Sequence, residues 1–224
     1  MSNKIKFAEV ECDFSYKHFI ECINNALKKG YTFLKFNENN KANEYNKVIF
    51  FRHDVDFDVE LALRMAEIEN KQGIKSTYFI RVLGRYNSWN INIFNSIKKI
   101  MDLDHEIGLH YEEDFSVLNN RNFAEDLEFH KLMLEKLLRI NIRSFAPHEP
   151  INTKSIHLPK EVAKKLDAIE AYNDFFFREC KYISDSGSRW REGCMHDFIN
   201  KDIKKLCILT HPIFWYERSP IENY

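Results

Sequence analysis

The chain has 224 residues, of which 44% are hydrophobic and 30% charged, enough to bury a sizeable core in a soluble protein. Its 33 basic and 34 acidic side chains leave a net charge of -1, so nothing in the charge favours a nucleic acid or an anionic membrane as partner. The amino terminus lacks the apolar core of a signal peptide, and no stretch approaches the ~20 apolar residues of a membrane span. These features predict a cytoplasmic protein without a transmembrane segment.

The cysteines are odd in number and widely spaced, and no Cys-x-x-Cys pair occurs among Cys12, Cys22, Cys180, Cys194 and Cys207. This pattern favours reduced thiols over a disulfide framework or a structural zinc site. An enzyme without an export signal would meet substrates inside the cell rather than assembled wall polymer.

Hydrophobic periodicity predicts strands and helices in alternation. In chain order, we expect a helix at 14–27, a strand at 31–36, an Asn-rich surface loop at 37–43 and strands at 48–53, 75–81, 106–110, 143–147, 168–172, 181–184 and 206–210. Further helices are expected around 61–68, 93–101 and 123–138, the last with Asn122 and Glu125 spaced as a cap pair. Repeated β-α units predict a parallel sheet or barrel with its helices outside.

An acidic pair follows the apolar run that begins at Val48, in the segment Phe51-Arg52-His53-Asp54-Val55-Asp56. Residues i and i+2 of a strand point to the same side, so Asp54 and Asp56 can face one site at a sheet edge that binds ligands. Two close carboxylates repel each other unless a cation or a proton relieves them. The segment favours a metal with one carboxylate as ligand and the other as base. The alternative is a polar strand end with a helix cap.

Two more polar clusters follow predicted strands. His110 and Asp114 are four residues apart, and this spacing can place an imidazole and a carboxylate on one divalent metal. The alternative there is a solvated acidic loop. His148 lies in a loop between two prolines, which either present it to a ligand or form a rigid turn.

The last two clusters are rich in aromatic residues. Asp185, Arg189 and Trp190 lie in a Gly/Ser loop, where they could bind sugar hydroxyls and stack on a sugar ring, or where Trp190 could fill the core. His211 ends an apolar strand close to Trp215. A histidine there can act as a general acid near neutral pH, and the alternative is a hydrogen-bonded core residue.

The order of these clusters, ending in Leu209-Thr210-His211, resembles the polysaccharide deacetylase family (NodB homology, carbohydrate esterase 4). It is most similar to the divergent bacterial branch with Arg-His-Asp-Val-Asp, over about 48–216 of a single domain at 1–224. The resemblance implies an α/β fold, a distorted and incomplete (β/α) barrel. It also implies one divalent metal ion, zinc first and manganese, cobalt or iron as alternatives. The activity implied is hydrolysis of an N-acetyl or other acyl group on a sugar, in surface polysaccharide biosynthesis.

The resemblance also implies roles for single residues. Asp54 would be the general base, Asp56 and His110 metal ligands, and His211 the general acid. Asp114 stands where the family has the second histidine of its His-x-x-x-His motif, and would be the third ligand.

A second departure from the family pattern is Phe145, which stands where an arginine orients the base. Arg52, Arg189 or Arg191 could replace that arginine. The residues expected to contact substrate are His148, Asp185, Arg189, Trp190 and Trp215.

The substrate would be an acylated sugar, a nucleotide-sugar or a lipid-linked glycan. One alternative function is a non-catalytic carbohydrate-binding barrel that has lost metal chemistry at Asp114 and Phe145. Another is a metal-dependent phosphoesterase that uses the same carboxylates, although such enzymes favour a richer ligand set for two metals.

Overall fold

The computed structural model describes residues 13–149 and 154–217, so Cys12 and Pro150 lie outside the described residues. The strands are β1 (Thr32–Leu34), β2 (Val48–Val55), β3 (Thr77–Arg81), β4 (Glu106–Tyr111), β5 (Ser144–Pro147), β6 (Ile169–Glu170), β7 (Lys181–Ser184) and β8 (Lys205–Thr210). The α-helices are α1 (Tyr16–Lys28), α2 (Val59–Lys71), α3 (Ile91–Asp102), α4 (Glu113–Leu118), α5 (Phe123–Leu138), α6 (Lys160–Lys165) and α7 (Met195–Asn200). The remaining helical segments are the 3-10 helices η1 (Phe36–Glu44) and η3 (Pro212–Phe214) and the π-helix η2 (Phe175–Glu179).

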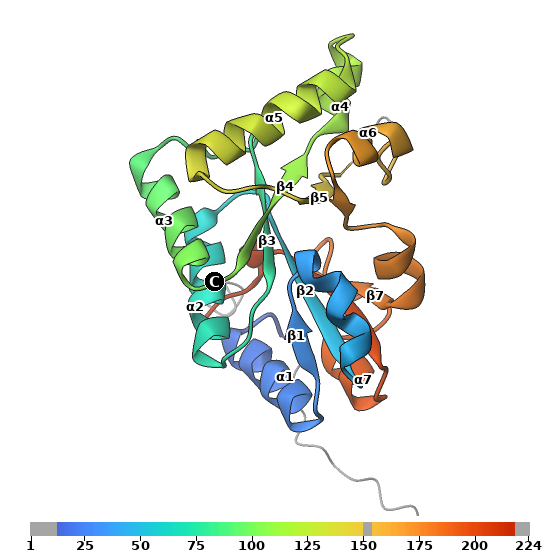
Figure 1. Ribbon diagram of the computed structural model, residues 1–224. Coiled ribbons are helices and arrows are strands. Elements are labelled where there is room, and N and C mark those ends of the chain that lie inside the picture. Colours follow the sequence, from blue (N-terminus) through green and yellow to red (C-terminus); the bar gives the residue numbers. More distant parts are fainter. Residues whose placement is uncertain (1–12, 150–153, 218–224) are drawn as a thin grey trace, which may run out of the picture.

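The strands form one parallel sheet that curls into part of a barrel, with helices on its outside (Figure 1). Their order is β6-β5-β4-β3-β2-β8-β7, with β1 paired to the first half of β2. The strands β6 and β7 are the two ends of this order, so the barrel is incomplete. The incomplete (β/α) barrel predicted from the sequence is confirmed.

The central strand β2 contributes to two cores because its side chains alternate between the faces of the sheet. Phe50 belongs to the cluster inside the barrel, whereas Phe51 packs in the cluster beneath α1 and α7. Arg52 and Asp54 continue the inward series of Phe50 and are also buried. The alternation of β2 therefore brings a guanidinium and a carboxylate inside the barrel, near the end where the strand stops.

The Asn-rich segment predicted as a surface loop lies in the 3-10 helix η1, whose polar residues are largely exposed while Phe36 and Ala42 pack into the barrel interior. Phe36 is fully buried and stacks on Phe176, with ring centroids 4.1 Å apart. The amide of Phe36 donates to Thr77 Oγ1, and the amide of Asn37 donates to Glu106 Oε2. These acceptors lie at the starts of β3 and β4, so η1 covers the amino end of the barrel, and a ligand would enter at the carboxyl end.

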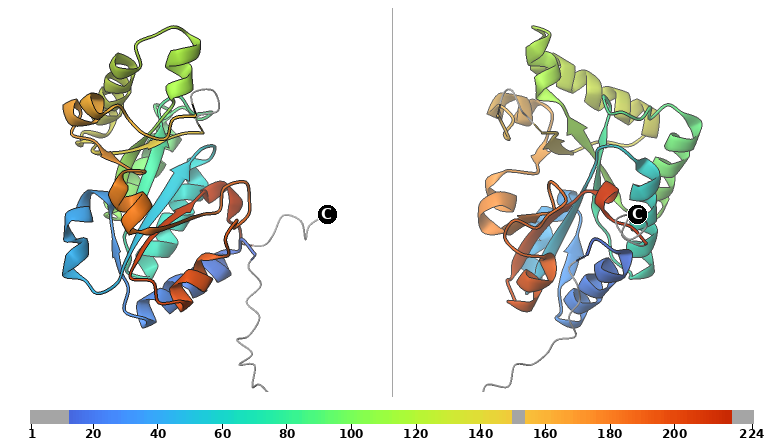
Figure 2. Two further views of the ribbon diagram at one scale, coloured as in Figure 1. Left: turned by 90° about the vertical axis from the view of Figure 1, so that its right-hand side faces the viewer. Right: turned by 180° about the vertical axis from the view of Figure 1, so that it is seen from behind.

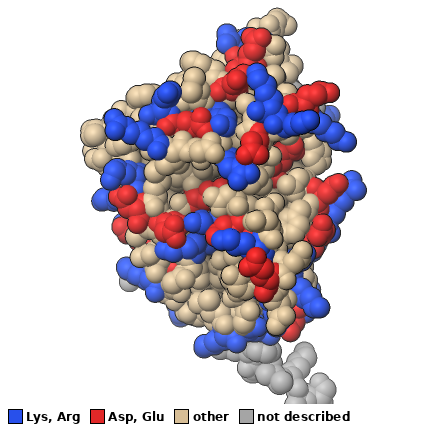
Figure 3. Space-filling model, viewed as in Figure 1, with Lys and Arg blue, Asp and Glu red and all other residues tan. Residues whose placement is uncertain are grey.

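Acidic and basic side chains are interspersed on the face shown in Figure 3 rather than gathered by sign, as a net charge of -1 leads one to expect. Within the part of the chain that the structure describes, no helix combines the length and the apolar character needed to cross a membrane.

Candidate active site

Side chains from the ends of four strands converge at the carboxyl edge of the sheet. His110 Nε2 lies 3.4 Å from Asp54 Oδ2 and 3.2 Å from Asp56 Oδ1. The carboxylate of Asp56 also lies 3.7 Å from His148 Nε2 and 3.9 Å from His211 Nε2. Because parallel strands end at the same edge, residues far apart in the sequence meet there.

Arg52 is the arginine that holds Asp54. Its Nε donates to Asp54 Oδ1 at 2.7 Å and its Nη2 donates to Oδ2 at 2.8 Å. The guanidinium carbon lies 4.6 Å from the ring centroid of Tyr172, and the whole side chain is buried. The sequence left Arg52, Arg189 and Arg191 as equal candidates for this contact; the last two are exposed.

This pairing keeps Asp54 ionised. Burial alone would raise the pKa of Asp54, but the charge of Arg52, helped by His110 and His211, lowers it to about 2. Both carboxylate oxygens are fixed by two parallel hydrogen bonds, which sets the orientation of the carboxylate as well as its charge.

Asp56 and His110 present a position suited to a cation. His110 Nδ1 lies 2.9 Å from the carbonyl of Ala146, to which it can only donate, so in the neutral ring Nε2 carries a lone pair. His110 Nε2 faces Asp56 Oδ1, a buried atom without another hydrogen-bond partner. An unpaired buried oxygen is costly, and a metal or proton relieves it. With His148, the donors are one carboxylate and two imidazoles, a set that suits zinc and other first-row metals.

Asp185 fixes the orientation of His211. Its Oδ1 accepts from His211 Nδ1 at 2.6 Å, and its Oδ2 accepts from Trp215 Nε1 at 2.9 Å. Burial alone would lower the pKa of His211, but the hydrogen bond and charge of Asp185, with the charges of Asp54 and Asp56, raise it to about 9. With Nδ1 directed at Asp185, the second ring proton lies on Nε2, which faces Asp56.

Two of the side chains predicted to contact substrate are buried, and their contact with substrate stays a prediction. Asp185 and Trp215 are each 0% exposed. The carboxylate of Asp185 is used by His211 and Trp215, and Trp215 packs on Phe19 with ring centroids 5.1 Å apart. Trp190 is half-buried, and Arg189 is exposed. A Gly/Ser loop is typical of the surface, and local composition could not reveal these long-range contacts.

His148 was predicted to contact substrate, and the structure brings it beside Asp56. Its backbone amide donates to the carbonyl of Tyr111 at 2.7 Å, which continues the pairing of β4 and β5 past the end of the strand. Its ring lies edge-on to that of His110, with centroids 5.3 Å apart. Asp114 lies in the first turn of α4, and its role as third ligand stays a prediction. The sequence signal for His148 was its position directly after a predicted strand.

A small cleft lies between the two ends of the sheet, close to Arg52. It has a volume of about 360 Å³ and is lined by Tyr172, Tyr182, Ser186 and Arg191, among others. The hydroxyls of Tyr172 and Tyr182 lie 3.2 Å apart and bridge the opening between the segments that carry β6 and β7. Because the Tyr172 ring also packs on Arg52, this cleft adjoins the ion pair of the active site.

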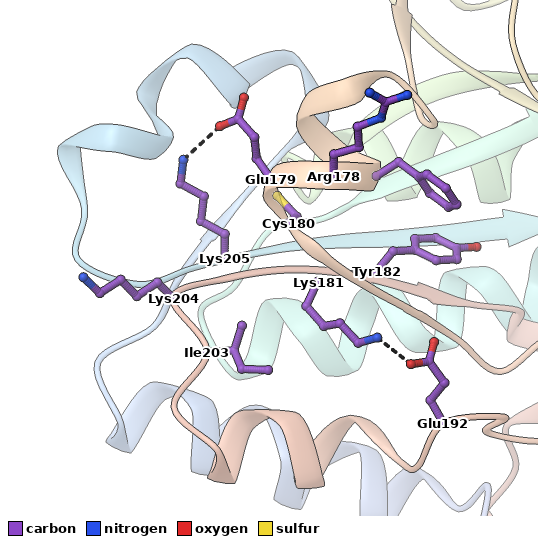
Figure 4. Close-up of a pocket in the computed structure, with 10 residues that line it drawn as sticks. Arg178, Glu179, Cys180, Lys181, Tyr182, Glu192, Ile203, Lys204 and Lys205 are labelled. Carbon is purple, nitrogen blue, oxygen red and sulfur yellow. Dashed lines mark hydrogen bonds and ion pairs between the residues drawn. The ribbon is translucent and has the colours of Figure 1, made fainter.

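A groove of about 830 Å³ lies beside the amino ends of β7 and β8 (Figure 4) and shares Phe177, Tyr182 and Glu192 with the cleft. Two of its lining residues, Lys181 and Lys205, begin β7 and β8, so the groove is at the amino ends of these strands. Lys205 pairs with Glu179 at 3.4 Å, and Lys181 pairs with Glu192 at 2.5 Å. The groove is larger than the cleft but lies away from the His and Asp residues, so we do not place the chemistry there.

Comparison with known proteins gives the fold an independent test. No family model matches the chain, and no curated protein matches it. A carbohydrate esterase 4 (CE4) family pseudoenzyme from Bacillus anthracis has 17% sequence identity and a TM-score of 0.50, over 75% of this chain and 55% of that chain. A polysaccharide deacetylase from Bacillus cereus has 14% identity and a TM-score of 0.50, over 75% of this chain and 80% of that chain. The matched region therefore spans about half the length of the pseudoenzyme. The fold of this chain is that of the CE4 polysaccharide deacetylases, as the order of its motifs predicted.

Proposed function

We propose that this protein is a metal-dependent carbohydrate deacetylase that removes an N-acetyl or other acyl group from a sugar. One observation carries the proposal: the buried oxygen Asp56 Oδ1 lies 3.2 Å from His110 Nε2 and 3.7 Å from His148 Nε2, and has no other hydrogen-bond partner. A divalent ion satisfies both groups, and the base and acid that amide hydrolysis needs lie beside it.

Asp56, His110 and His148 would hold the metal. A bound divalent ion supplies Lewis acidity, polarising the acyl carbonyl and lowering the pKa of water. Zinc suits a set of one carboxylate and two imidazoles, with iron, cobalt and manganese as alternatives. With His148 as the third ligand in place of the predicted Asp114, the metal would have two imidazole ligands, a softer donor set than two carboxylates and one imidazole.

The remaining steps belong to Asp54 and His211. Asp54 accepts a proton from the attacking water as the water oxygen bonds to the acyl carbon, and Arg52 holds the carboxylate in place. His211 donates a proton from Nε2 to the sugar nitrogen as the C–N bond breaks, because an amine anion is a poor leaving group. The products are a carboxylate and a free amino sugar.

The cleft beside Tyr172 and Tyr182 is the proposed position of the sugar. Ser186 and Arg191 line it and can hydrogen-bond hydroxyl groups. Phe57, directly after Asp56, is 44% exposed, and it is a better candidate than the buried Trp215 for an apolar platform. The substrate would be an acylated sugar, free, nucleotide-linked or lipid-linked.

A second candidate is a non-catalytic carbohydrate-binding barrel. It is favoured by the pseudoenzyme among the similar structures and by Phe145 at the position of the family's arginine. This candidate predicts sugar binding that survives Asp54→Asn and the absence of a tightly bound metal. The ion pair of Arg52 and Asp54 argues against it, since a pseudoenzyme has no need of an oriented base.

The third metal ligand is tested by comparing His148→Ala with the matched variant Asp114→Ala. We expect His148→Ala to weaken metal binding by more than about 100-fold, the upper range for loss of an outer contact, and to abolish acetate release from N-acetylated amino-sugar oligomers. Asp114→Ala should retain both properties. The measurement is competition with a chromophoric chelator, alongside an acetate assay. Loss of metal in Asp114→Ala with retention in His148→Ala would instead identify Asp114 as the ligand.

The pH profile tests the pairing of Asp185 with His211. Asp185 raises the pKa of His211, and a general acid works only while protonated, so activity is present below that pKa and lost above it. Asp185→Asn removes the charge and lowers the pKa, so we expect the alkaline limb of kcat to move to lower pH. The exposed Asp174→Asn serves as the control. An alkaline limb at the same pH in Asp185→Asn and wild type would assign it to another group.

A further inference from the structure

Four metal-ligating side chains outside the active site meet between α1 and α7. His18 and Cys22 lie four residues apart on one face of α1, Cys194 is the N-cap of α7, and His196 follows in its first turn. His18 Nε2 lies 3.1 Å from Cys194 Sγ and 3.6 Å from Cys22 Sγ. One ligand atom from each of the four residues lies within 4.8 Å of the others. The two helices lie side by side in Figures 1 and 2.

The wide spacing of the cysteines in the sequence favoured reduced thiols over a structural zinc site, but the fold brings two of them together with two histidines. Cys22 and Cys194 are far apart in the sequence, but the fold packs α1 against α7, and Asn25 Nδ2 donates to Asn200 Oδ1 across the same interface at 2.9 Å. The signal in the sequence was a His-x-x-x-Cys pair and a Cys-x-His pair rather than Cys-x-x-Cys.

The geometry fits one tetrahedral ion. Two thiolates and two imidazoles are a ligand set of structural zinc sites. Bonds of about 2.0–2.3 Å in a tetrahedron keep the ligand atoms about 3.3–3.8 Å apart. The distances from His18 Nε2 to the two sulfurs, 3.1 and 3.6 Å, are close to this range. His18, Cys22 and Cys194 are at most 3% exposed, and neither cysteine forms a disulfide.

The contacts around His196 and Cys194 also support a metal-binding site. His196 Nε2 lies 3.0 Å from Asp197 Oδ1, a carboxylate contact of the kind that orients metal-bound histidines. Gly193, directly before Cys194, has a φ of +112°, and a Cβ there would lie 2.9 Å from Asp197 Oδ2. Glycine at this position therefore lets the chain enter α7 without displacing Asp197.

We propose that His18, Cys22, Cys194 and His196 bind one structural zinc ion, separate from the active site. The ion joins α1 to the start of α7, directly after the loop that carries Asp185. Two residues before His18, α1 also meets the segment after His211, where the amide of Tyr16 donates to the carbonyl of Tyr216 at 2.8 Å. Zinc at this position stabilises α1 against both segments that hold the Asp185–His211 pair, without contacting substrate.

Cobalt(II) added to the metal-free full chain tests this proposal. Sulfur-to-cobalt charge transfer gives an absorption band that only a thiolate site can produce, and the active site offers only nitrogen and oxygen donors. We expect the band in wild type and in His110→Ala, a band of about half the intensity or less in Cys22→Ser and in Cys194→Ser, and its loss when both cysteines are replaced. Cys180→Ser, which changes a buried cysteine outside the cluster, should keep the band. The band reports this site even if the deacetylase proposal fails.

A second variant is needed in case replacing the buried Cys22 or Cys194 prevents folding. His196 is only half-buried, so His196→Asn removes a ligand with little loss of packing. We expect weaker cobalt binding and a smaller rise of the Tm on adding zinc than in wild type. No sulfur band in folded wild-type protein would overturn the proposal. So would a Cys22–Cys194 disulfide in protein purified without reductant, or a cobalt affinity in His196→Asn equal to that of wild type.

Discussion

Replacing Asp54 with asparagine is expected to lower kcat for deacetylation by about 100- to 10,000-fold, the range of general base catalysis. The amide keeps the shape of the carboxylate but cannot accept a proton from water. The metal should remain bound, because Asp56, His110 and His148 are unchanged. Acetate release and metal content, measured on the same preparation, check both parts of this expectation.

Arg52 complicates the Asp54→Asn experiment because the substitution leaves its guanidinium buried without a charged partner. Circular dichroism and thermal unfolding of each sample should therefore accompany the assay, so that activity is compared only between folded proteins. Wild-type turnover in folded Asp54→Asn would reject Asp54 as the base. Loss of turnover together with loss of metal would make Asp54 a ligand.

Replacing Arg52 with methionine is expected to destabilise the protein by about 3–5 kcal/mol, as breaking a buried ion pair does. Asp54 would keep its charge inside the barrel without the two hydrogen bonds that offset its burial. The stacking on Tyr172 would be lost as well. The free energy of unfolding in urea measures this effect.

Arg189→Met is the matched control for Arg52→Met, because the Arg189 side chain is exposed. Surface substitutions of this kind usually change stability by less than about 0.5 kcal/mol. An equal free energy of unfolding in the two variants would show that the Arg52–Asp54 pair does not stabilise the fold.

The elements that could be predicted are those with a long, regular pattern. The unbroken apolar run of β2 marks a strand buried on both faces. The periodicity of α5 and its cap also held, since Asn122 Oδ1 accepts from the amides of Ala124 and Glu125. The helices α4, α6 and α7 have six residues each, fewer than two turns, so no periodicity could reveal them. The amides of η1 donate to Thr77 and Glu106 on distant strands, and an Asn-rich composition does not indicate such contacts.

In the active site, too, some residues could be predicted from the sequence and some contacts could not. Asp54, Asp56, His110 and His211 could be brought together from sequence because each stands at the end of a predicted strand. The arginine that pairs with Asp54 could not be chosen from the sequence. Of the three candidates only Arg52 is buried, and its burial depends on the assembled barrel. The contacts of Asp185 could not be predicted for the same reason, because its hydrogen bonds to His211 and Trp215 span 26 and 30 residues.

The proposed metal centre is tested most directly by metal titration of the metal-free chain, wild type beside His110→Ala, with zinc, manganese, cobalt and iron offered in turn. We expect wild type to bind one metal ion more than His110→Ala, at a site without sulfur ligands, and acetate release from acetylated sugars to require this ion. Equal stoichiometry and affinity in the two proteins would contradict a metal centre at Asp56 and His110, and with it the deacetylase mechanism.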